Sequence, residues 1–308
     1  MATAIGVAQQ VDWDVAEQIG LWQDAWMRFR RNRLAVAGLV FIILMIVLAV
    51  GARLPTTPGG LWRILHLTGD PFQQDVTNTF AGPSLQHLLG TDVLGRDLLS
   101  RIFYGASISL SIGIIVQFLI LVIGGSIGMA AGYFGGWIDN LLMRFTDIMY
   151  AFPDLLLVLV FVAAFGPSFW SIFIALGLVY WVGLARLVRG QVLSIKEKEF
   201  IEAARMTGTA PLKLIIKHLL PNSLGPVIVT LTFGIPAAIF TEAALSFLGI
   251  GIRPPEPSWG VMIEDGYAGI FADPQLVIFP GIAVALTMLS FTFVGDGLRD
   301  ALDPRMRR

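Results

Sequence analysis

The sequence contains no cysteine, and charged residues make up only 14% of its 308 positions. Without cysteine the chain forms neither a disulfide framework nor a thiolate metal site. A soluble domain usually carries about a quarter charged residues, whereas here 56% of the residues are hydrophobic. One globular core cannot bury so much apolar surface, so a water-soluble enzyme and a disordered chain are both excluded. The composition predicts a polytopic, all-α membrane protein.

Long segments without charge predict six membrane-spanning helices. A bilayer core of about 30 Å requires roughly 20 apolar helical residues. The charge-free segment Leu34 to Ala52 is longer than a signal core, so we expect a span rather than a cleavable signal. Gly166-Pro167 divides another apolar region into a helical hairpin, whose first arm we expect to begin nearer Leu141. The six predicted spans are residues 34–52, 107–131, 145–165, 168–185, 226–250 and 276–296.

The positive charges predict the orientation of these helices. With both termini inside, sixteen of the 21 lysines and arginines fall on inner segments and five on outer ones. Positive residues gather on cytoplasmic loops, so we expect both termini in the cytoplasm. The predicted organisation is a cytoplasmic or interfacial helix (1–33), a first span (34–52), an outer loop (53–106), a five-helix core (107–297) with an inner loop (194–225), and a cytoplasmic tail (298–308).

Before the first span, apolar residues recur at spacings of three and four: Val15, Ile19, Trp22, Trp26 and Phe29. This pattern predicts a helix with one apolar face, followed by basic residues. Such a face suits a helix lying on the inner leaflet of the membrane. It suits packing against another subunit equally well, and the sequence leaves both interpretations open.

Several residue patterns needed for catalysis are lacking. The common nucleotide-binding loop ends in Gly-Lys, and none of the four lysines follows a glycine. The three histidines are scattered and form no zinc-protease motif. We therefore predict no catalytic residue, no metal site and no cofactor in this chain.

One pattern imitates a hydrolase. Gly124-Gly125-Ser126-Ile127-Gly128 matches the surroundings of a hydrolase nucleophile, which requires a strand-to-helix turn. Here the pattern lies within a long apolar segment, and Gly124, Gly128 and Gly132 share one helix face. Small residues at this spacing favour close helix packing in lipid, which is the interpretation we prefer over an intramembrane hydrolase.

The inner loop at residues 194–226 reads SIKEKEFIEAARMTGTAPLKLIIKHLLPNSLGP. Ser194 and Glu197 have the spacing of a capping box that starts a helix. Gly208 permits a sharp turn after that helix. The first half of the loop therefore predicts a short helix that ends at a glycine.

The second half of the loop predicts another short helix. Thr209 can cap it, and Pro211 fits its first turn. An apolar stripe then continues until Pro221, where we expect the helix to stop. The two helices would form a compact knob, in which Ala203 and Ala204 permit another protein to approach closely.

This loop resembles the EAA loop of ABC importer permeases, whose pattern is E-A-A-x3-G-x9-I-x-L-P. His218 stands where isoleucine is usual. In that family the loop forms the coupling helix that docks into a groove of the ATP-hydrolysing subunit, and the resemblance implies the same role here. The matching residues are Glu202, Ala203, Ala204, Gly208, Leu220 and Pro221.

More of the chain, roughly residues 20 to 305, is similar to the C-type permease of dipeptide and oligopeptide importers. Ser107 stands where that branch commonly has arginine. The motifs that carry the likeness include Gly90-Thr91-Asp92, Gly95-Arg96-Asp97, Ser100-Arg101, Glu242-Ala243-Ala244, Pro257-Ser258-Trp259-Gly260 and Gly295-Asp296-Gly297.

The resemblance implies a type I ABC importer permease fold and a subunit that forms half of a path for di- or oligopeptides. Its implied partners are a B-type permease, two ATP-binding subunits that hold ATP and Mg, an outer substrate-binding protein and the lipid membrane, with no nucleic acid. The implied location is a bacterial or archaeal cell membrane. A permease for nickel or another peptide-like solute, and a self-sufficient channel or secondary transporter, remain alternatives.

Charged residues near the spans carry further expectations. Glu242 lies 16 residues after Pro226, about 24 Å along a helix and still at membrane depth. A carboxylate there requires a partner or water, so we expect helix packing or a place beside the translocation path. Arg144 and Asp147 can pair on one helix face.

The outer segments carry an excess of acidic residues over their five arginines. Such a surface could meet a partner protein, or it could simply be solvated. Trp259 lies in a proline-rich stretch and suits the outer membrane interface. The outer acidic residues are Asp70, Asp75, Asp92, Asp97, Glu256, Glu264, Asp265 and Asp273.

Overall fold

The computed structural model describes residues 20–54, 60–65 and 67–303, and regular structure in these ranges is helical. Two residues, Thr91 and Asp97, form an isolated antiparallel bridge. The elements are α1 (Leu21–Arg31), α2 (Arg33–Arg53), α3 (Gly60–Ile64), α4 (Leu98–Phe134), α5 (Gly136–Tyr150), α6 (Asp154–Phe165), α7 (Phe169–Lys196), α8 (Glu199–Met206), α9 (Pro211–Leu214), the π-helical turn η1 (Ile215–Leu219), α10 (Leu220–Phe247), α11 (Trp259–Tyr267) and α12 (Gln275–Leu302).

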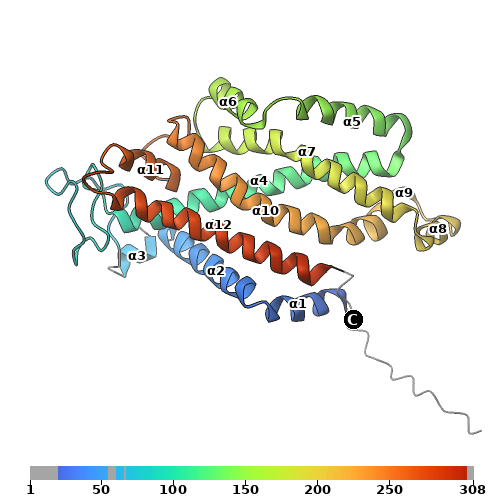
Figure 1. The fold of residues 1–308 in the computed structure, drawn as a ribbon, viewed down its shortest axis with the longest axis horizontal. Helices are drawn as coiled ribbons and strands as arrows, with labels where there is room; N and C mark the ends of the chain where they lie inside the picture. The colour runs from blue at the N-terminus through green and yellow to red at the C-terminus, as the bar shows by residue number, and fades with distance from the viewer. Residues whose placement is uncertain (1–19, 55–59, 66, 304–308) are drawn as a thin grey trace, which may run out of the picture.

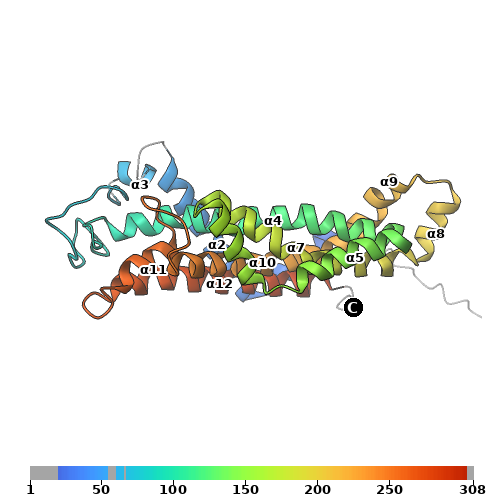
Figure 2. The ribbon, with the colours of Figure 1, turned by 90° about the horizontal axis from the view of Figure 1, so that it is seen from above.

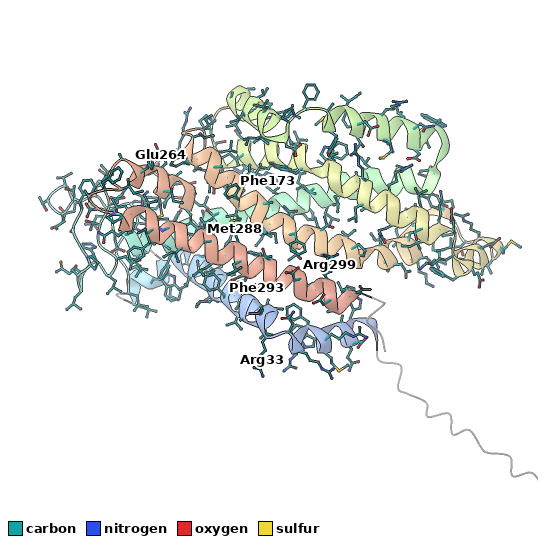
Figure 3. The ribbon with its side chains drawn as sticks, in the orientation of Figure 1. Arg33, Phe173, Glu264, Met288, Phe293 and Arg299 are labelled. Atoms are coloured by element: carbon teal, nitrogen blue, oxygen red, sulfur yellow. The ribbon has the colours of Figure 1, made fainter. Side chains whose placement is uncertain are left out.

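The long helices run side by side and give the molecule an elongated shape (Figures 1 and 2). At one end lie α8 and α9, and at the other lie α11 and the segment that precedes α4. Arg299, near the end of α12, and Glu264, on α11, lie far apart along the long axis of the molecule (Figure 3). The helix α1 packs against α12, so the first described helix and the end of the last one are neighbours.

Five helical stretches are long and apolar enough to cross a membrane, and the pair α5 and α6 would make a sixth span. This pair is bent by 83°, so the region of the predicted span 145–165 is not one straight helix but is broken between Tyr150 and Asp154. Pro153 explains the break, because proline lacks the backbone N–H and restricts the residue before it. The candidate spans are Arg33–Arg53, Leu98–Phe134, Phe169–Lys196, Pro211–Phe247 and Gln275–Leu302.

Several helices are longer than the predicted spans, among them α4, α7 and α12. α4 begins at Leu98 rather than residue 107, because the Asp97 carboxylate accepts a hydrogen bond from the Ser100 N–H at 2.8 Å and caps the helix. α12 continues to Leu302, so the segment that begins at residue 298 is helical at first. The helices at these two ends are therefore longer than the spans predicted from hydropathy.

The glycine face of α4 packs tightly against α7. A Cβ on Gly124 would lie 2.6 Å from the Trp181 carbonyl oxygen, and one on Gly128 would lie 2.4 Å from that of Ala185. Contacts this close to a neighbouring backbone leave no space for a side chain. The predicted packing role of these glycines is confirmed, and Ser126 lies inside the helix rather than at a strand-to-helix turn.

Ion pairs join α5 to α7. Arg189 donates to both carboxylate oxygens of Asp139, at 2.6 and 2.7 Å. The Arg186 guanidinium donates to Asp147 at 2.8 Å and lies 4.3 Å from the ring centre of Tyr150. The predicted pairing of Asp147 with a residue of its own helix, Arg144, is therefore wrong, because the packing of α7 brings another arginine to this carboxylate.

The apolar face of α1 is divided between two environments. Ala25 and Phe29 are buried, and Phe29 lies against α12 beside Gly297. Trp22 and Trp26 are more than half exposed. The expectations for residues 15 and 19 fall outside the described residues, so the choice between lipid and a second subunit stays open.

Candidate coupling site

The inner loop begins later than the sequence predicts. α7 continues to Lys196, so Ser194 lies inside it, and α8 begins after Lys198 without a side-chain cap. The predicted capping box is therefore wrong. Ile195 explains the difference, since it is buried in the main hydrophobic cluster and holds the last turn of α7 in helical form.

α8 ends at the predicted glycine. Gly208 has φ +76°, its N–H donates to the Arg205 carbonyl at 2.9 Å, and the Thr209 N–H donates to the Ala204 carbonyl at 3.2 Å. These two hydrogen bonds form a Schellman motif, which requires a left-handed residue at this position. A Cβ on Gly208 would meet no atom within 4 Å, so the backbone conformation alone selects glycine.

The second helix differs from its prediction at both ends. Its N-cap is Ala210 rather than Thr209, although Pro211 does occupy the first turn. At the other end Pro221 does not stop it, because α9, η1 and α10 follow one another without a break. Proline clashes with the carbonyl four residues earlier, which here is Lys217, in the widened π turn that makes room for the ring.

We call residues 199–219 the knob. Three apolar side chains fix it to the bundle: Ile201, Leu214 and Leu219, each at most 1% exposed. His218, at the position where the family pattern has isoleucine, lies with its ring 6.4 Å from that of Phe200. This histidine therefore makes a contact within the knob, between η1 and α8.

The exposed surface of the knob includes three large apolar side chains. Met206 is 85% exposed, Leu212 67% and Ile216 56%. Glu202 and Ala203 are also exposed on α8, and Ala204 is half-buried. Leu220 and Pro221 are exposed at the start of α10. Exposed apolar groups gathered at one end of a chain are typical of a docking surface.

Glu242, the predicted path residue, lies fully buried in α10. Its carboxylate accepts hydrogen bonds from the hydroxyls of Ser258 at 2.6 Å, Ser246 at 2.8 Å and Ser109 at 3.3 Å. Ser258 also caps α11, and Ser109 belongs to α4. The carboxylate thus joins three helices, and a role in the path stays a prediction. Ser246 has the i,i+4 spacing that places it on the same helix face as Glu242, whereas no local spacing identifies Ser109 or Ser258.

A second buried network lies at the opposite end. Arg96 donates to Asp92 at 2.6 Å, and Arg96 and Arg101 each donate to Asp265 at 3.1 Å. Both arginines are at most 5% exposed. These contacts join α11 to the segment before α4, so two of the acidic residues predicted to lie outside, Asp92 and Asp265, have a structural role.

Two further residues of the segments predicted to lie outside, Trp259 and Asp75, make specific hydrogen bonds within the chain. Trp259 is fully buried and donates its indole N–H to the Ile102 carbonyl at 3.1 Å, so the expectation of an interfacial tryptophan is wrong. Asp75 accepts hydrogen bonds from the hydroxyl and N–H of Thr77 and from the Asn78 amide. The Thr77 hydroxyl is the main cause that lowers the pKa of Asp75.

No three His, Asp or Glu side chains gather as metal ligands would within the described ranges. The candidate site residues form a structural connection instead. A knob with an apolar surface continues directly into α10, and buried polar contacts hold α10 against α4 and α11 at its far end.

Comparisons with known proteins agree with this arrangement. Residues 124–308 match the model of the family described as binding-protein-dependent transport system inner membrane component. Residues 20–83 match the N-terminal TM domain of oligopeptide transport permease C.

Curated relatives cover nearly the whole chain. It is 43% identical to the dipeptide transport system permease protein DppC of Bacillus subtilis (strain 168), over 93% of this chain and 86% of that protein. It is 40% identical to the oligopeptide transport system permease protein OppC of the same organism, over 95% and 92%. It is 41% identical to the glutathione transport system permease protein GsiD of Escherichia coli O157:H7, over 93% and 91%.

One solved structure shares the fold. A chain of the MetNI methionine ABC transporter, determined in inward-facing conformations, is similar with a TM-score of 0.51 at 18% identity. The likeness covers 67% of this chain and 96% of that chain.

Proposed function

The chain belongs to the family of binding-protein-dependent transport system inner membrane components, and we propose that the solute it passes across the membrane is a di- or oligopeptide. It is a multi-pass membrane permease subunit with the type I ABC importer fold. Relatives of similar identity are named for dipeptides, oligopeptides and glutathione. All three are small peptides, and this shared chemistry supports a peptide substrate here.

The knob is the proposed contact with an ATP-binding subunit. The observation that carries this role is the surface that includes Met206, Leu212 and Ile216, exposed beside Glu202 and Ala203. A partner groove that covers these side chains would remove them from water, and burial of a large apolar side chain contributes roughly 1.5–3 kcal/mol.

The connection of the knob to α10 supplies the transmission. Because α9, η1 and α10 are continuous, a displacement of the knob moves the whole stretch Pro211–Phe247. In the proposed cycle, ATP and Mg bind to two partner subunits, whose closure moves the knob. A B-type permease completes the path, an outer substrate-binding protein delivers the peptide, and both termini of this chain lie in the cytoplasm.

The test is ATP-driven peptide uptake by the complete importer reconstituted in proteoliposomes. We expect Glu202→Arg combined with Gly208→Arg to reduce uptake at least tenfold and to weaken cross-linking to the ATP-binding subunit. Asp300→Arg is the matched control, since Asp300 is also an exposed acid, near the end of α12. Normal uptake by the double variant would refute the coupling role, and flux through this chain alone, without ATP, would favour a channel or secondary transporter.

A further inference from the structure

A hollow of about 210 Å³ lies between α4, α7 and α10, in the middle of the bundle. Its volume is several times the roughly 30 Å³ that one water molecule occupies in the liquid. Most of its lining is apolar or small, and its polar members are Gln117, Tyr180, Thr230 and Thr241. The lining contains no charged side chain.

Gln117 is the unusual member of this lining. It lies in a membrane-spanning stretch, is 7% exposed, and no group among the described residues hydrogen-bonds to its amide. A polar side chain at such a depth is costly unless it meets a partner. Gly234 makes room for it, because a Cβ there would lie 2.2 Å from the amide oxygen of Gln117. The amide therefore faces the hollow as an unused donor and acceptor.

The two threonines have a more restricted chemistry. The Thr230 hydroxyl donates to the Pro226 carbonyl at 2.9 Å, and the Thr241 hydroxyl donates to the Ala237 carbonyl at 2.8 Å. Each hydroxyl has then used its single hydrogen and retains only acceptor capacity. The hollow thus offers two acceptors from α10, a donor–acceptor pair from α4 and the Tyr180 hydroxyl from α7.

This set of groups complements an amide rather than an ion. A peptide group carries one N–H donor and one C=O acceptor, which the Thr230 oxygen and the Gln117 amide can satisfy together. Thr241 lies eleven residues further along α10, about 16 Å, and would meet another amide of the same peptide. The uncharged lining would not bind a charged side chain strongly, so passage would not depend on the side chains of the solute. Gly183 is exposed and leaves the hollow open on the α7 side.

We propose that this hollow is a subsite that receives a backbone amide of the peptide during its passage. The proposal rests on the proposed import of peptides. Thr230 and Thr241 stand on α10, the helix that continues from the knob. Motion of the knob would therefore shift these acceptors relative to Gln117 on α4, and the subsite would form and disperse with the ATP cycle.

The first experiment fills the hollow. A Cβ on Gly183 would meet no atom within 4 Å, so Gly183→Leu adds a side chain whose first atom overlaps no neighbour. We expect this variant of the complete importer to lose peptide uptake at least tenfold, while the substrate-binding protein still stimulates its ATPase activity. Gly281→Leu is the control, because Gly281 on α12 also has free space and does not line the hollow. Wild-type uptake by Gly183→Leu would overturn the proposal.

The second experiment tests the hydrogen bonds without changing the volume. We expect Gln117→Leu and Thr230→Val to raise the KM for uptake at least threefold. We also expect them to reduce the preference for a tripeptide over its N-methylated analogue. The binding protein is the same throughout, so a change in this preference belongs to the permease. An unchanged KM and preference in both variants would overturn the subsite, whereas absence of peptide uptake by the wild-type importer would refute the proposed function instead.

Discussion

Glu242 allows a sharp test of how buried polar groups hold this bundle. Replacement by leucine removes the acceptor for three serine hydroxyls, two of them within 2.8 Å. An intramolecular hydrogen bond contributes about 0.5–1.5 kcal/mol, so three of them contribute up to about 4 kcal/mol. Removal of the buried carboxylate offsets part of this loss, so we expect Glu242→Leu to destabilise the chain by about 3 kcal/mol. Glu242→Gln retains an acceptor for both close serines and should change stability by less than about 1 kcal/mol.

The assay is thermal unfolding of the purified importer, followed by peptide uptake in proteoliposomes. At about 2–4 °C per kcal/mol, Glu242→Leu should melt roughly 6–12 °C below the wild type. We expect it to assemble with its partner subunits and to transport less. Glu242→Gln should melt and transport much like the wild type.

A double variant separates the hydrogen bonds from other effects of leucine. Ser258→Ala removes one hydroxyl that needs the carboxylate, so Glu242→Leu combined with Ser258→Ala should lose less stability than the sum of the single losses. A melting temperature of Glu242→Leu equal to the wild type would refute the reasoning. Loss of uptake in Glu242→Gln at unchanged melting temperature would instead show that the charge itself serves the path.

Three further perturbations have expected outcomes. Asp265→Ala removes one carboxylate partner from two buried arginines, and we expect it to lower the free energy of unfolding by about 3–5 kcal/mol, measured by thermal unfolding. Glu264→Ala, at the adjacent exposed acid, should change the free energy of unfolding little. Gly128→Ala places a methyl against the backbone of α7 and should cost about 1–3 kcal/mol, while Gly125→Ala, with ordinary contact distances, should not destabilise. Because the pKa of Asp75 is lowered, its ionised carboxylate stabilises the turn at pH values above the ordinary aspartate pKa of about 3.9. This stabilisation should be lost as the pH falls below that value, and amide exchange of the turn measures the loss. In Asp75→Asn this pH dependence of the protection should be absent.

Periodicity and composition predicted much of this molecule. An apolar run long enough to cross lipid must satisfy its backbone hydrogen bonds internally, so helices follow from hydropathy alone. The face shared by Gly124 and Gly128 and the turn at Gly208 were predictable for a similar reason, since only glycine permits such close approach or a left-handed backbone. These features depend on residues near one another in the chain.

Other features were decided by tertiary packing. The burial of Ile195 extends α7 past its predicted cap, and a π turn lets the helix continue through Pro221. The partner of Asp147 comes from another helix rather than from its own.

The hydrogen bond from Ser109 to Glu242 joins residues 133 positions apart, and the hollow beside Gln117 is lined by residues from three separate helices. Local residue spacing does not predict such contacts, because they form only when separate helices pack against one another. The sequence by itself therefore determined the helical class, most of the spans and the knob, whereas the fold decided which polar groups meet inside.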